Sequence, residues 1–80
     1  MVDSNQAPDP SLQKLVNVLG PAQAEVVITE TMRRLGLTEL RSPDDRFRFG
    51  AALIKKGGVL EAIGRAIKIQ AILHGARAED

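Results

Sequence analysis

Glycine and proline residues divide the chain into segments, and their positions constrain the fold more than any other feature. The junctions Asp9-Pro10, Gly20-Pro21, Ser42-Pro43 and Gly57-Gly58 each precede a stretch of apolar residues spaced three or four apart. Proline suits the first turn of a helix because its missing N–H would have no partner there, and glycine readily ends a helix. The pattern predicts an all-α fold, a compact bundle of about four short helices with tight glycine and proline junctions.

The predicted helices cover residues 10–19, 21–35, 43–56 and 59–74. The second contains a β-branched run at residues 26–29, which favours a strand locally. The caps at both of its ends and the polar residues opposite its apolar side nevertheless favour a helix. We expect residues 1–8 to form a disordered tail, residues 9–76 a single helical domain, and residues 77–80 a solvated C-terminal tail.

The chain is short and has 80 residues, no cysteine and one histidine. A domain of this size buries only about 60% of its unfolded surface, and its core contributes roughly 3–5 kcal/mol. Disulfides and thiolate metal sites are excluded because both require cysteine. We therefore expect no metal and no cofactor, and association is the expected source of extra stability.

The fourth predicted helix has two apolar stripes, whereas a surface helix of a globular domain needs one. At 100° per residue, one stripe contains Leu60, Ile63, Gly64, Ile67 and Ala71, and the other contains Val59, Ala62, Ala66, Ile69 and Leu73. Such a helix either lies at the centre of its own fold or turns its second stripe toward another chain. The sequence alone leaves both alternatives open.

The third predicted helix is also apolar on two sides, with Phe49 and Leu53 opposite Phe47 and Ile54. Two such helices in one small domain favour association, and two-fold symmetric dimers are the commonest oligomers. We expect a non-enzymatic protein-interaction module, either a homodimer or a module that binds a helical partner protein. The expected interface comprises Phe49, Leu53, Val59, Ala62, Ala66, Ile69 and Leu73.

Charge is distributed unevenly, although the formal net charge is only +1. Residues 1–30 hold four acids and one base, residues 31–78 hold ten bases and four acids, and residues 79–80 are both acidic. The basic excess suggests an alternative function as a small nucleic-acid-binding or regulatory protein. The absence of Tyr and Trp weighs against base stacking, and ordinary solvated faces would also account for the charges. The candidate anion contacts are Arg33, Arg34, Lys55, Lys56, Gly57 and Gly58.

No catalytic pattern is present in the sequence. His74 is the only histidine and has no nucleophile near it in sequence, and Asp44 and Asp45 are adjacent, so their side chains diverge on a helix. We expect no enzymatic activity and no small-molecule substrate. No apolar run approaches the ~20 residues of a membrane span, and the first ten residues lack the basic and apolar regions of a secretory signal. We therefore expect a cytoplasmic protein.

Overall fold

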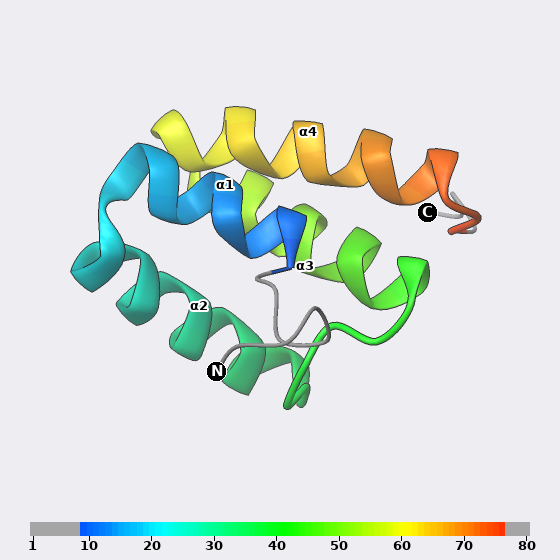
Figure 1. Ribbon diagram of the computed structural model, residues 1–80, viewed down its shortest axis with the longest axis horizontal. Coiled ribbons are helices and arrows are strands. Elements are labelled where there is room, and N and C mark those ends of the chain that lie inside the picture. The colour runs from blue at the N-terminus through cyan, green and yellow to red at the C-terminus, as the bar shows by residue number, and fades with distance from the viewer. Residues whose placement is uncertain (1–8, 77–80) are drawn as a thin grey trace, which may run out of the picture.

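A computed structural model describes residues 9–76 of the chain. Its four helices are α1 (Pro10–Leu19), α2 (Pro21–Leu35), α3 (Pro43–Lys56) and α4 (Gly58–Leu73) (Figure 1). The all-α prediction is confirmed, and α4 begins and ends one residue earlier than expected. The β-branched run in the second segment is helical. The tails predicted at residues 1–8 and 77–80 lie outside the described residues.

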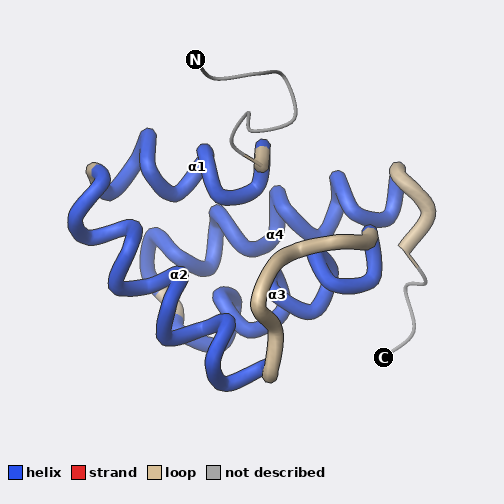
Figure 2. Tube along the Cα trace, turned by 60° about the horizontal axis from the view of Figure 1, so that its bottom comes forward, coloured by secondary structure: helices blue, strands red, loops and turns tan. Residues whose placement is uncertain are grey.

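The helices form two pairs. Helices α3 and α4 run antiparallel and make the most extensive contact in the fold, and α1 and α2 make the next most extensive one. The two pairs meet through smaller contacts of α2 with α3 and of α1 with α4. The segment between α2 and α3 crosses from one pair to the other (Figure 2). Helix α3 is therefore in contact with both α2 and α4.

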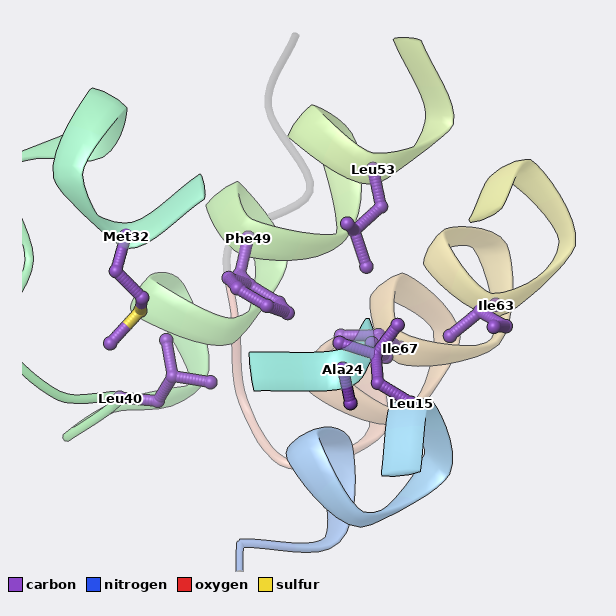
Figure 3. Packing of buried hydrophobic residues seen from close by; sticks show 8 residues of the cluster. All are labelled: Leu15, Ala24, Met32, Leu40, Phe49, Leu53, Ile63 and Ile67. Atoms are coloured by element: carbon purple, nitrogen blue, oxygen red, sulfur yellow. The ribbon is translucent and has the colours of Figure 1, made fainter. Parts of the chain in front are cut away.

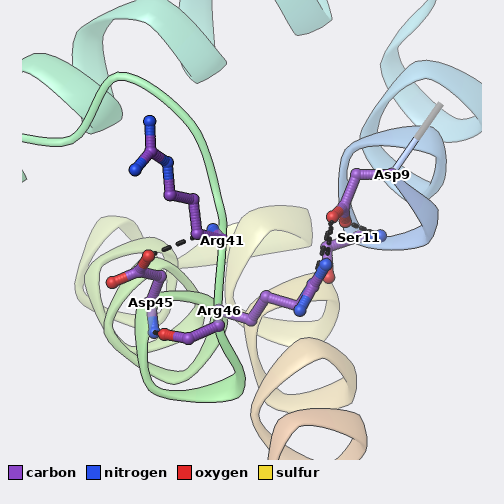
Figure 4. Close-up of polar contacts among 6 residues, drawn as sticks. Asp9, Ser11, Arg41, Asp45 and Arg46 are labelled. Atoms are coloured by element: carbon purple, nitrogen blue, oxygen red, sulfur yellow. Dashed lines mark hydrogen bonds and ion pairs between the residues drawn. The ribbon is translucent and has the colours of Figure 1, made fainter. Parts of the chain in front are cut away.

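The starts of α1 and α3 are capped by the side chains of Asp9 and Ser42. The Ser11 backbone N–H donates to Asp9 Oδ1 over 2.8 Å, and the Asp45 N–H donates to Ser42 Oγ over 3.1 Å. Asp9 has a second role, because Arg46 Nη2 of α3 donates to its Oδ2 atom over 2.7 Å (Figure 4). One carboxylate thus caps α1 and ties it to α3.

The core lies where the two helix pairs meet (Figure 3). Every helix contributes to it, and so does Leu40 from the segment between α2 and α3. Phe49 and Leu53 of α3 have no exposed surface, and neither do Leu15 of α1 and Ile67 of α4. The buried cluster comprises Leu15, Ala24, Met32, Leu40, Phe49, Leu53, Ile63 and Ile67.

Two glycines allow α3 and α4 to approach closely. A Cβ atom on Gly64 would lie 2.5 Å from the Gly50 carbonyl oxygen, and one on Gly50 would lie 2.7 Å from the Gly64 carbonyl oxygen. Any larger residue would push the two backbones apart. The connection between these helices also requires glycine, since Gly57 and Gly58 have φ angles of 75° and 60°.

Candidate interaction surface

Helix α4 buries one of its apolar stripes and exposes the other. Ile63, Gly64, Ile67 and Ala71 are buried against the rest of the chain. On the opposite side, Val59 is 51% exposed, Ile69 58% and Leu73 72%. Helix α4 is therefore a surface helix, and the alternative in which it lies at the centre of the fold is wrong. We call this second stripe the α4 stripe: Val59, Ala62, Ile69 and Leu73 are exposed, and Ala66 between them is half-buried.

The α4 stripe is continuous along the helix. Its members are separated by three, four, three and four residues, and they span about 21 Å at 1.5 Å per residue. Ile72, which is 42% exposed, extends the apolar surface along one edge. The same edge carries the ion pair between Arg65 Nη2 and Glu61 Oε2 at 2.6 Å. Contiguous exposed apolar surface of this kind is typical of an interaction site.

The two α3 residues predicted for the interface are in the core instead. Phe49 and Leu53 have no exposed surface, so assigning them to the interface was wrong. The reason is the position of α3, which contacts α2 on one side and α4 on another. Both apolar sides of α3 thus find partners within the chain. The remaining five predicted interface residues are the members of the α4 stripe.

The structure divides the predicted anion contacts between different places. Arg34, Lys55 and Lys56 line one groove between α2 and α3. Arg33, although adjacent to Arg34, lies outside this groove and lines clefts elsewhere on α2. Gly57 lies between α3 and α4, and Gly58 is the first residue of α4. These two glycines do not line the groove.

Arg48 is a groove residue that the sequence analysis did not single out. It lies on α3, and its Nη2 atom donates to the Leu35 carbonyl oxygen at the end of α2 over 3.2 Å. Helical spacing offered a signal, because residues 48, 52 and 55 lie on one side of a helix. This spacing does not show that the same side of α3 faces the end of α2, so the groove could not be predicted from the sequence.

Several of the basic side chains are held in ion pairs. Arg41 pairs with Glu39, Arg46 with Asp9, and Arg65 with Glu61. Lys68 Nζ lies 4.7 Å from the centroid of the Phe47 ring, a cation–π contact. These cations belong to separate local contacts on different elements. They do not form one continuous basic surface.

The acidic and histidine side chains are dispersed. Within residues 9–76, no three histidine or carboxylate side chains gather closely enough to hold a metal ion. His74 is exposed at the end of α4 and lines a cleft with Lys14 and Arg46, which are both cationic. None of the described helices is long and apolar enough to cross a membrane.

Comparison with known proteins adds no relative: the chain matches no protein-family model, no curated protein and no solved structure.

Proposed function

We propose that this protein is a non-enzymatic interaction module that forms a homodimer by pairing α4 of one chain with α4 of a second. The observation that carries the proposal is the α4 stripe, with Val59, Ile69 and Leu73 each more than half exposed. Removing apolar surface from water is the main driving force of protein association. A cytoplasmic location, expected from the sequence, is part of the same proposal.

The spacing of the stripe supports a second copy as its occupant. Apolar residues that alternate at intervals of three and four form the seam along which two helices of a coiled coil pack. A second copy of α4 carries an apolar stripe with the same spacing and length, so the two stripes can cover each other along their whole length. Two-fold contacts of this kind close on themselves and stop at the dimer.

The residue sizes along the stripe favour an antiparallel pair. In one register, Leu73 faces Ala62 of the second copy, and Ile69 faces Ala66 of the second copy. The two-fold axis repeats both contacts, so each of the four layers sets a large side chain against a small one. Alternation of this kind fills the space between helices evenly. A parallel pair would instead set alanine against alanine and isoleucine against isoleucine, which gives layers of unequal width.

Crosslinking tests the orientation, since the chain has no cysteine of its own. In the antiparallel register, residue 62 of one copy lies beside residue 73 of the other. The two copies of residue 62 are about 16 Å apart along the helix axis. With a bis-maleimide linker shorter than this separation, the double variant Ala62→Cys/Leu73→Cys is expected to form covalent dimers, and Ala62→Cys alone is not.

Two results would overturn the proposal. Efficient dimer formation by Ala62→Cys alone would refute the antiparallel register. A wild-type chain that sediments as a monomer at high micromolar concentration would refute the homodimer itself. Within one chain, residues 62 and 73 are also about 16 Å apart, so the short linker cannot join them and imitate the expected result.

Nucleic-acid binding, the alternative that the charge distribution suggested, has less support. Most of the basic side chains of residues 31–76 are held in ion pairs or local contacts on different elements. A protein that follows a phosphate backbone needs a continuous basic surface. Binding of DNA or RNA whose affinity falls steeply with salt would favour this alternative over the homodimer.

A further inference from the structure

The groove between α2 and α3 concentrates positive charge. It has a volume of about 440 Å³, and its basic residues are Arg34 from α2 and Arg48, Lys55 and Lys56 from α3. Glu30 lies beside it, 3.9 Å from Arg34 Nη2 and 3.5 Å from Lys56 Nζ. The four lining cations outnumber this carboxylate. The groove therefore attracts anions.

Thr31 adds an observation that is independent of charge. Thr31 is among the residues that line the groove and is 1% exposed, and its Oγ1 atom has no hydrogen-bond partner among the described residues. A buried hydroxyl without a partner destabilises the fold. Basic residues near helix C-termini are stabilised by the helix dipole, which accounts for the position of Lys55 and Lys56. The dipole does not account for the buried hydroxyl of Thr31.

We propose that this groove binds the phosphate group of a small organic phosphate monoester. A phosphate monoester carries a charge of nearly −2 at neutral pH and has three strong acceptor oxygens. The guanidinium groups of Arg34 and Arg48 can each donate two parallel hydrogen bonds to such oxygens. We assign the unpartnered Thr31 hydroxyl as one further donor to the phosphate.

The rest of the groove suits the organic part of the ligand. Ala51 and Ala52 of α3 line it, and their small side chains leave room for an apolar group beside the phosphate site. Its volume lies within the range of about 300–1,000 Å³ that is typical of small-molecule sites. None of these residues belongs to the α4 stripe, so the site is separate from the proposed dimer contact and can be tested without it.

An NMR titration of the full chain tests the proposal. The probes are inorganic phosphate and butyl phosphate, each added at constant ionic strength. Both are expected to produce saturable shifts in the amide signals of α2 and α3 residues that line the groove. Butyl phosphate is expected to bind more tightly, since its alkyl group reaches the alanine-lined part. Shifts that rise without saturation for both probes would overturn the proposal.

A matched pair of variants separates the groove from general charge attraction. Arg34→Gln is expected to weaken butyl phosphate binding by about tenfold, because a charge-assisted hydrogen bond is lost. Arg33→Gln removes the same charge one residue away but outside the groove, and is expected to change the affinity by less than about twofold. Equal losses in the two variants would overturn the proposal.

Thr31→Val tests the hydroxyl. Valine has nearly the same shape and no polar atom, so the variant is expected to raise Tm and to weaken butyl phosphate binding by about fivefold. Unchanged binding together with a raised Tm would remove Thr31 from the site and overturn the proposal. An RNA oligonucleotide that shifts the same signals more tightly than butyl phosphate would also overturn it, in favour of nucleic acid.

Discussion

Replacing Ile69 with glutamine should weaken the proposed dimer contact without disturbing the core of the single chain. Ile69 is 58% exposed in one chain, so the variant is expected to change monomer stability by no more than about 0.5 kcal/mol. In the proposed dimer the exposed part of the Ile69 side chain would become buried. Complete burial of such a side chain contributes about 1.5–3 kcal/mol, so the exposed fraction contributes about 0.9–1.7 kcal/mol per chain. Two-fold symmetry doubles this value, and dimerisation should weaken by roughly 20- to 300-fold.

Sedimentation equilibrium over a range of protein concentrations measures this change. Val26→Gln is the matched control, because Val26 lies on α2, away from the α4 stripe, and is 62% exposed. The wild type and Val26→Gln should dimerise with the same affinity, and Ile69→Gln should remain monomeric at concentrations where they are dimeric. Thermal unfolding at low concentration, where all three are monomers, should give similar Tm values.

One outcome would contradict the exposure of Ile69 in the single chain, and another would contradict the specificity of the α4 contact. A large loss of Tm in dilute Ile69→Gln would mean that the side chain is packed inside the chain, so the placement of α4 would be wrong. Equal weakening of dimerisation by Val26→Gln would mean that exposed apolar residues cause association without regard to position. The α4 stripe would then not be a specific contact.

Two further substitutions test the packing of the helices. Gly64→Ala should lower the free energy of unfolding by about 1–3 kcal/mol in chemical denaturation, because its Cβ would lie 2.5 Å from the Gly50 carbonyl oxygen; wild-type stability would contradict the close approach of α3 and α4. Asp9→Ala should cost about 1–3 kcal/mol through loss of the cap and of the contact with Arg46. Asp9→Asn keeps a capping oxygen and should cost less, and equal losses in the two variants would show that the cap contributes nothing.

The helix boundaries could be predicted because the signals that set them are local. Asp9 and Ser42 accept hydrogen bonds from N–H groups two and three residues further on, and such caps depend on few distant contacts. The buried stripe of α4 was predictable for a similar reason, since the spacing of its residues around the helix is a property of the helix alone. These features required no knowledge of how the helices pack.

The packing partners could not be predicted, since they depend on the path of the chain. Helices α3 and α4 are both apolar on two sides, and the sequence does not show which of them lies between two others. The structure covers both sides of α3, which buries Phe49, and only one side of α4. Two further features also depend on tertiary contacts. Gly50 packs against Gly64, and Arg34 and Arg48 line the same groove.

The completeness of the core bears on how folding and association are related. Phe49, Leu53 and Ile67 are fully buried within one chain, so the monomer has a core without any contribution from a second copy. The α4 stripe lies outside that core, and the proposed dimerisation would add to stability only by mass action. A core this small contributes roughly 3–5 kcal/mol, so even a dimer of moderate affinity would make a large difference to the folded population. Stability should therefore rise with protein concentration in the wild type and much less in a chain whose stripe is disrupted.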